Sequence, residues 1–402
     1  MKAIFGIFLL SFFIMNAINE ALSITAEGGV GAVYTMTNGA QFNEVLIYRL
    51  NSLGRLTLSG TIRTNGIGVN TAATDPLSSQ GSMIVYSNYL FAVNAGSNSL
   101  SMFVINPIDA TQLTLISTQP TNGYFPISVT VNSRYACVLT GGNETGIRCF
   151  TYSPSGLSIV PSFDRDLTSY ISQTIPPTGV PNTFSQIQFS ADDQSLIVSV
   201  KGASSRSRGY LLFFRLTNNG AVLSSNPTLQ TPPEGIFPFS MTLVGRNGLL
   251  ITDPGARGVL TQTYSSISGT ISNSILTPID ASIAGALCWS VYSPTIGNYY
   301  VIGLSPAAVV ELNVDLSSTT NPVQIVRYYP LPRNTGALET TIVTLNGIDY
   351  LYVIGTTAQV INSYRLDAPG RASFNGVTVV RQRTMTNIPK IAGLAAYVQI
   401  SS

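Results

Sequence analysis

Two short charged segments contain the side chains best suited to bind an acidic group. Lys201 begins the sequence Lys-Gly-Ala-Ser-Ser-Arg-Ser-Arg-Gly, in which Arg206 and Arg208 follow. Asp253 and Arg257 lie in a second segment, Asp-Pro-Gly-Ala-Arg. Lysine and arginine bind carboxylates through charge-assisted hydrogen bonds. Both segments are therefore candidate sites for a small acidic ligand or an acidic sugar; the alternative for each is a solvated loop with an internal ion pair.

The chain contains no histidine, and this excludes several catalytic mechanisms. A Ser-His-Asp triad cannot form, and no imidazole can act as a general acid or base near neutral pH. The sequence also lacks a P-loop, a Gly-x-Ser-x-Gly motif and a zinc-binding cluster of His and Cys. We therefore predict no catalytic residue, no metal and no cofactor.

Two of the cysteines flank a predicted turn. Cys137 and Cys149 lie on either side of Gly141-Gly142-Asn143, and folding the chain about Asn143 places them opposite each other on neighbouring strands. The spacing predicts a disulfide that stabilises by ~3 kcal/mol. Asn143 also begins an Asn-x-Thr sequon at the hairpin tip, which predicts a glycan there. The alternative is two unpaired core cysteines and an unused sequon, while Cys288 is predicted to be buried and free.

The beginning of the chain predicts secretion. Lys2 precedes an apolar stretch from Ala3 to Met15, and Ala21-Leu22-Ser23 offers small residues for signal-peptide cleavage. The stretch is shorter than the ~20 residues that a membrane span needs. We therefore expect a signal peptide over residues 1–23 and an extracellular mature protein over residues 24–402, with no membrane span and with the cell wall or the matrix as destinations. The net charge of +2 gives no basis for nucleic-acid binding.

The positions of the short strand patterns indicate an all-β repeat protein. Short runs rich in Val, Ile, Thr, Tyr and Phe alternate with Gly, Pro, Asn and Ser along the chain. One unit reads Ser82–Tyr86, Tyr89–Asn94, Ser99–Ile105 and Leu113–Ile116. Later units begin near Ile127, Gln186, Phe239, Trp289 and Thr340. These intervals are typical of the blades of a β-propeller.

The two ends of the chain complete the count of units. The first unit has strand patterns at Ala32–Met36, Glu44–Tyr48 and Leu56–Leu58 but no inner strand, and Ala392–Val398 is a strand without a unit. Pairing the two gives a seven-bladed β-propeller closed by its C-terminal strand, which removes exposed sheet edges. Two packed β-sandwiches are the alternative architecture.

Three segments carry a resemblance to a known family. They are Phe125–Val131, Phe184–Asp193 and Phe237–Thr242, each followed by an apolar strand and a polar or glycine-containing loop. In these segments the chain resembles the lactonase-like seven-bladed propellers, which include carboxymuconate cyclase and bacterial phosphogluconolactonase. It resembles secreted fungal carboxymuconate-cyclase-like proteins more closely still.

The resemblance also implies which residues face the central channel. The family's inner strands often carry a histidine there, and the matching positions in this chain are Ser128, Gln186, Ser240 and Trp289. Hydroxyl and amide groups do not titrate near neutral pH, so they cannot replace imidazole as proton carriers. We therefore expect these residues to bind a ligand rather than to catalyse. Trp289 is a candidate to stack on a ligand ring, the alternative being a core aromatic.

Two functional hypotheses follow. The first is a secreted, non-catalytic or catalytically degenerate propeller that binds a glycan, a small acidic ligand or an extracellular protein through its central mouth or loop face. The alternative is a lactonase-like or carboxymuconate-cyclase-like enzyme that uses Arg, Lys and carboxylates in place of histidine. The mouth discriminates between them, because a converging cation and carboxylate favour the enzyme, whereas a funnel of Ser, Gln and apolar groups favours the binding protein.

Overall fold

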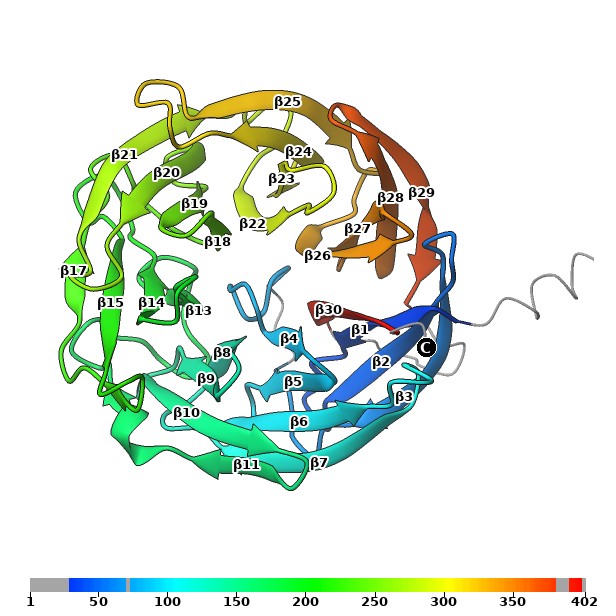
Figure 1. Ribbon diagram of the computed structural model, residues 1–402, viewed down its shortest axis with the longest axis horizontal. Helices are drawn as coiled ribbons and strands as arrows, with labels where there is room; N and C mark the ends of the chain where they lie inside the picture. Colours follow the sequence, from blue (N-terminus) through cyan, green and yellow to red (C-terminus); the bar gives the residue numbers. More distant parts are fainter. Residues whose placement is uncertain (1–28, 70–72, 381–389, 400–402) are drawn as a thin grey trace, which may run out of the picture.

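Seven antiparallel sheets surround a central axis in the computed structural model, which describes residues 29–69, 73–380 and 390–399 (Figure 1). Each sheet is one blade, and its strands run in order from the axis outward. The architecture confirms the predicted seven-bladed β-propeller. The two-sandwich alternative is wrong.

The blades are numbered along the chain, and their strands are given from the axis outward. Blade 1 contains β30 (Ala392–Val398), β1 (Gly31–Met36), β2 (Glu44–Leu50) and β3 (Leu56–Arg63). Blade 2 contains β4 (Met83–Tyr86), β5 (Tyr89–Asn94), β6 (Ser99–Ile105) and β7 (Leu113–Pro120). Blade 3 contains β8 (Pro126–Val131), β9 (Tyr135–Thr140), β10 (Gly146–Ser153) and β11 (Gly156–Ile159), with the short β12 (Arg165–Asp166) also paired to β10.

The remaining four blades follow the same order. Blade 4 contains β13 (Phe184–Phe189), β14 (Ser195–Val200) and β15 (Tyr210–Thr217), to which β16 (Val222–Leu223) and β17 (Thr228–Gln230) both pair. Blade 5 contains β18 (Met241–Val244), β19 (Gly248–Asp253), β20 (Gly258–Tyr264) and β21 (Ile271–Pro278). Blade 6 contains β22 (Leu287–Tyr292), β23 (Tyr299–Leu304), β24 (Ala307–Val314) and β25 (Val323–Pro330). Blade 7 contains β26 (Ala337–Leu345), β27 (Ile348–Gly355), β28 (Val360–Ala368) and β29 (Arg371–Val379).

Burial explains why the second strands read as continuous apolar runs. Every residue of β9, β14 and β19 is buried, because each blade packs its two faces against its neighbours. The outermost strand β3 alternates between partly buried and exposed residues instead. The alternation is that of a strand at the rim with water on one side.

The closing strand lies where the sequence predicts it. β30 pairs antiparallel with β1, and the register aligns Gly31 with Val398 and Thr35 with Leu394. Beyond the strand, the Gln399 N–H donates to the Val30 carbonyl at 2.9 Å. The C-terminal strand therefore supplies the inner strand of the first blade.

The inner strand of blade 5 begins later than predicted. β18 starts at Met241 rather than near Phe239. The Ser240 N–H donates to the Thr252 hydroxyl at 3.0 Å instead of to a carbonyl of the neighbouring strand. A side chain thus takes the place of a ladder partner, so regular pairing starts one residue further on.

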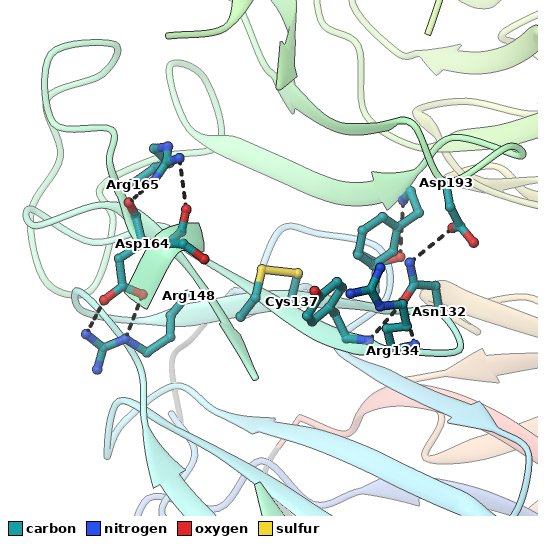
Figure 2. Close-up of a disulfide and its surroundings, with 12 residues drawn as sticks. Asn132, Arg134, Cys137, Arg148, Asp164, Arg165 and Asp193 are labelled. Atoms are coloured by element: carbon teal, nitrogen blue, oxygen red, sulfur yellow. Dashed lines mark hydrogen bonds and ion pairs between the residues drawn. A yellow bond between two sulfur atoms is a disulfide. The ribbon is translucent and has the colours of Figure 1, made fainter. Parts of the chain in front are cut away.

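The disulfide has the predicted connectivity (Figure 2). Cys137 on β9 is directly opposite Cys149 on β10, with their Cα atoms 4.0 Å apart. Cys288 is buried and free, also as predicted. Asn143 is exposed at the tip of the β9–β10 hairpin, and its glycosylation stays a prediction.

Two further findings bear on the compartment. The described residues contain no helix of the length and apolar character that crossing a bilayer requires. A disulfide is typical of proteins from oxidising compartments. The predicted signal peptide, residues 1–23, lies outside the described residues, so secretion stays a prediction.

Candidate functional site

A segment of the chain crosses the central axis. Residues Ser78–Ser82, which we call the crossing segment, precede β4 and extend into the centre of the ring (Figure 1). On the side of blade 3, the Ser79 hydroxyl donates to the Ile127 carbonyl at 2.8 Å. The Val129 N–H donates to the Gly81 carbonyl at 2.8 Å. The segment is thus bonded to the inner strand of a neighbouring blade.

The same segment also binds blades on the other side of the axis. The Gln80 side chain bonds both backbone groups of Ser290, accepting from its N–H at 2.9 Å and donating to its carbonyl at 3.2 Å. The Ser82 hydroxyl donates to Glu339 Oε1 on blade 7 at 2.9 Å. Because these partners belong to blades 6 and 7, the segment crosses the channel from wall to wall.

Two of the predicted channel residues hold the crossing segment. The Ser128 hydroxyl donates to the Gln80 carbonyl at 2.7 Å. The Trp289 indole N–H donates to the Ser79 carbonyl at 3.0 Å. Trp289 is only 1% exposed and packs edge-to-face on Phe239, with ring centroids 5.2 Å apart. Both side chains are occupied within the protein.

The other two predicted channel residues bond the walls to each other. The Gln186 amide nitrogen donates to the Met241 carbonyl at 3.2 Å, which joins blade 4 to blade 5. The Ser240 hydroxyl lies 2.8 Å from the Ser290 hydroxyl, which joins blade 5 to blade 6. Their part in ligand binding stays a prediction, and their observed contacts are structural.

The two charged residues of the second segment, Asp253 and Arg257, have different environments. The Asp253 carboxylate accepts hydrogen bonds from the N–H groups of Ile236, Phe237 and Ala256 at 2.8–2.9 Å. Asp253 is buried, and this burial raises the pKa of its carboxyl. Arg257 is exposed in the adjoining loop, with a φ of 57°. Asp253 thus fastens one loop to another, while Arg257 is left in solvent.

Lys201 lies at the end of the crossing segment. Its side chain is 1% exposed, and Nζ donates to the Ser78 carbonyl. Nζ also lies 5.0 Å from the ring centroid of Phe239 and 5.8 Å from that of Phe237. Burial lowers the pKa of the Lys201 ammonium group, and the nearby Asp75 carboxylate partly opposes that shift. The buried cation thus has an aromatic wall, a carbonyl and a carboxylate around it.

Asp75 is the carboxylate that sequence analysis missed. It begins the turn Asp75-Pro76-Leu77-Ser78, in which Oδ1 accepts from the N–H groups of Leu77 at 3.2 Å and Ser78 at 2.9 Å. This is the usual chemistry of an Asp-Pro turn. Burial raises the pKa of the Asp75 carboxyl, and the Ser78 N–H and the Lys201 charge oppose that shift. A backbone hydrogen bond from the Ser79 N–H also lowers this pKa.

Asp75 lines a cavity of about 210 Å³ between blades 3 and 4. The cavity lies on the face that carries the connections between blades, which we call the upper face. Its remaining walls are mostly apolar, and they include Leu77, Phe125, Ile127, Pro177, Val180 and Phe184. The carboxyl group of Asp75 therefore meets a partly enclosed apolar space.

Two residues of this cavity have an unusual backbone. Ser78 has a φ of 52° and Phe125 a φ of 62°, in a region that non-glycine residues seldom adopt. Both are fixed by long-range bonds, Ser78 by Lys201 and Phe125 by Asn98, whose Oδ1 accepts from the Phe125 N–H at 2.9 Å. These bonds fix the backbone on this side of the cavity.

A second cavity of about 330 Å³ lies on the other side of Lys201. Tyr170, Tyr210 and Arg208 line it together with Lys201, so it is polar and cationic. The two predicted charged segments do not converge on a single site, since Asp253 and Arg257 line neither cavity. The only sequence signal for Asp75 is the long connection over residues 64–82, because long connections often carry function.

The fold and the site together define a seven-bladed β-propeller whose axis is crossed by residues 78–82 and which has cavities on its upper face. A proposed 6-phosphogluconolactonase from Bacteroides uniformis has a similar structure, with a TM-score of 0.67 and 16% identity over 92% of this chain and 100% of that one. The periplasmic gluconolactonase of Pseudomonas aeruginosa has a TM-score of 0.67 and 16% identity, over 92% of this chain and 99% of that one. A proposed 6-phosphogluconolactonase from Bacteroides fragilis has a TM-score of 0.64 and 15% identity, over 92% of this chain and 98% of that one.

Similarity at this level of identity shows the fold alone. It confirms the lactonase-like propeller architecture that the sequence resembles, whereas the closer resemblance to fungal carboxymuconate-cyclase-like proteins stays a prediction. No protein-family model matches the chain, and a search of curated proteins returns no match.

Proposed function

We propose that the chain is a lactone-opening or lactone-closing enzyme whose general acid–base group is Asp75. The sequence favoured a binding protein, with the enzyme as the alternative. The arrangement of the mouth supports the alternative, because the Ser and Gln side chains expected to form a binding funnel are bonded within the protein. A cation and a carboxylate, Lys201 and Asp75, converge on the upper face instead.

The observation that carries the proposal is the position of the Asp75 carboxyl group in the wall of the 210 Å³ cavity. A general base must reach the proton that it removes and must have a pKa near the working pH. An ordinary aspartate, with a pKa of about 3.9, is a weak base at neutral pH. Burial raises the pKa of Asp75 and so moves the carboxylate toward the range in which it can both take and return a proton.

The reaction needs a single water molecule and no other reagent. Asp75 takes a proton from the water molecule while the oxygen of that water attacks the carbonyl carbon of the lactone. The bond from that carbon to the ring oxygen then breaks, and the protonated Asp75 returns the proton to the leaving oxygen. The product is a hydroxy acid, and the reverse sequence closes the lactone with release of water.

Lys201 acts as a positioning residue in this mechanism. Its bond to the Ser78 carbonyl holds the turn that carries Asp75. Its charge also opposes the rise in the pKa of Asp75, so that the carboxylate stays available as a base. Fold likeness to gluconolactonases supports the reaction class by analogy only.

The test is the ring opening of a broad lactone panel by the purified secreted protein, followed across pH 5 to 9. We expect turnover that Asp75→Asn lowers by ~10²–10⁴-fold, as is typical for loss of a general acid–base. The rising limb of the pH profile should lie above the ordinary aspartate range and should disappear in the variant. Ligand binding measured by thermal shift should remain.

Asp280→Asn is the matched control. Asp280 caps its own turn on the upper face, where Oδ1 accepts from the Ser282 N–H at 2.9 Å, but it lines neither cavity described above. Turnover should therefore be unchanged in this variant. Ligand binding without turnover by the unaltered protein would reinstate the binding-protein hypothesis. For either function, a secreted and extracellular protein is supported by the disulfide and by the predicted signal peptide.

A further inference from the structure

We propose that the substrate is an apolar lactone, one that carries an alkyl or aryl substituent, rather than a sugar lactone or an acidic lactone. The inference rests on the proposed function and adds the substrate class. It comes from the cavity beside Asp75, whose walls differ from those expected for a polyol or an anion.

The inner walls of the cavity are apolar and fixed. Phe125, Ile127 and Phe184 are each no more than 2% exposed, and Leu77 is 4% exposed. Hydrophobic burial of a substituent against such walls is favourable, at roughly 25 cal/mol per Å² of apolar surface. Sugar hydroxyls placed there would lose water without gaining partners, which is costly.

The cavity also lacks a counter-charge for an acidic substrate. No lysine or arginine is among the described residues that line it. The Thr183 hydroxyl, one of its few polar groups, already donates to the Val180 carbonyl at 2.7 Å. The basic side chains Lys201 and Arg208 line the other cavity. A carboxylate or phosphate bound in this cavity would therefore lie beside the Asp75 carboxyl group with no lysine or arginine in the cavity wall to bind it.

The surface around the cavity is apolar as well. Val180, which lines the cavity, is 43% exposed, and Ile175 is 48% exposed. Tyr124, 37% exposed, lies close to Ile175, because a Cβ atom added at Gly142 would meet both within 3.2 Å. Clustered exposed apolar side chains mark binding sites more often than scattered ones do. The cluster extends the apolar wall outward, as a substituent longer than the cavity would require.

The experiment compares γ-lactones of increasing alkyl chain length and an aryl lactone with glucono-δ-lactone and carboxymuconolactone. Turnover and thermal shift are both measured. We expect kcat/KM for the alkyl series to rise by about fourfold per methylene until the cavity is full. Sugar and acidic lactones should be at least tenfold poorer substrates and should give no saturable shift.

Val180→Phe tests the cavity directly. Because Val180 is half exposed, the variant protein should fold with the larger side chain, which narrows the cavity. Its KM for the long-chain lactones should rise at least tenfold, with little change for the shortest one. Ile283→Phe is the matched control, since Ile283 is also 43% exposed on the upper face but does not line the cavity.

The outcomes separate the two proposals. Preferred turnover of the sugar or acidic lactone would overturn the apolar class and leave the proposed enzyme standing. Saturable binding of the alkyl lactones without turnover would overturn the enzyme and leave the apolar ligand class standing. No binding and no turnover of any lactone in the panel would overturn both.

Discussion

Two segments join distant parts of this ring, and they do so by different means. β30 closes the circumference through a β-ladder with β1, and successive side chains such as Leu394 and Ala395 enter two different core clusters. The crossing segment spans the axis without regular structure and is held by individual hydrogen bonds from Ser128, Trp289 and Lys201. We call each of these two connections a tie. The tie through β30 is a repeating ladder, whereas the tie through the crossing segment is a set of single hydrogen bonds.

The difference shows where stability and specificity reside in this propeller. A ladder adds a backbone bond and a buried side chain with each residue, so its strength grows with its length. Each contact of the crossing segment instead depends on one side chain in one place. Glu339 belongs to both ties, because it accepts from Ser82 at one oxygen and from the Leu394 N–H at the other, at 3.0 Å. The two ties can therefore be broken separately or together.

Removal of the closing strand should have the largest effect. Deleting residues 392–402 exposes the inner face of blade 1 and leaves β1 as an open edge. Because neighbouring blades share their apolar faces, we expect little or no folded protein to be secreted. Secretion yield and the thermal melt of any recovered protein measure this. A truncated chain that melts like the full-length protein would show that the ring does not need β30.

A smaller effect is expected at Glu339, as a function of pH. Burial raises the pKa of its carboxyl from 4.5 to about 7. A raised pKa in the folded state means that folding favours the protonated form of Glu339. The contribution of this protonation to stability is therefore complete below about pH 4.5 and is lost as the pH rises through about 7. Unfolding free energy should therefore fall by on the order of 2–3 kcal/mol between pH 5 and pH 8.

Glu339→Gln separates this effect from other titrations. Glutamine does not titrate, so the fall in stability between pH 5 and pH 8 should flatten in urea unfolding. The variant should also be less stable at low pH, because a glutamine amide has one acceptor oxygen and its NH₂ group only donates. It therefore cannot accept hydrogen bonds from Ser82 and Leu394 at the same time. If the variant keeps the full slope, Glu339 does not couple the two ties to pH.

The smallest effect is expected for a single contact of the crossing segment. Gln80→Met keeps the size of the side chain but leaves the N–H and carbonyl of Ser290 without their partner. Since Gln80 is only partly buried, water replaces part of the bond, and we expect a loss of about 1 kcal/mol. Urea unfolding measures the loss, and limited proteolysis should show faster cleavage between residues 73 and 82. A loss above that for the β30 deletion would reverse the ranking of the two ties.

The repeat and its closure could be predicted from the sequence alone. Alternating and apolar runs mark strands because side chains in a strand point to opposite faces, and this pattern is local. A first unit without an inner strand and a last strand without a unit, Ala392–Val398, left one simple pairing. The Cys137–Cys149 bond followed in the same way, from a turn midway between them. Each of these predictions needs only neighbours along the chain or a regular ladder.

The candidate site could not be predicted in this way, because its residues meet only in the folded protein. Asp75 and Lys201 lie far apart in the chain, and nothing in either local sequence shows that they meet. The same holds for the partners of Ser128 and Trp289, because the family resemblance placed these two residues on the channel without revealing that the crossing segment bonds to them there. The shift in the pKa of a carboxyl depends on burial and on nearby charges, both of which arise only when separate blades pack together. Strand patterns repeat along the sequence, whereas the contacts that make this site occur once, across the axis.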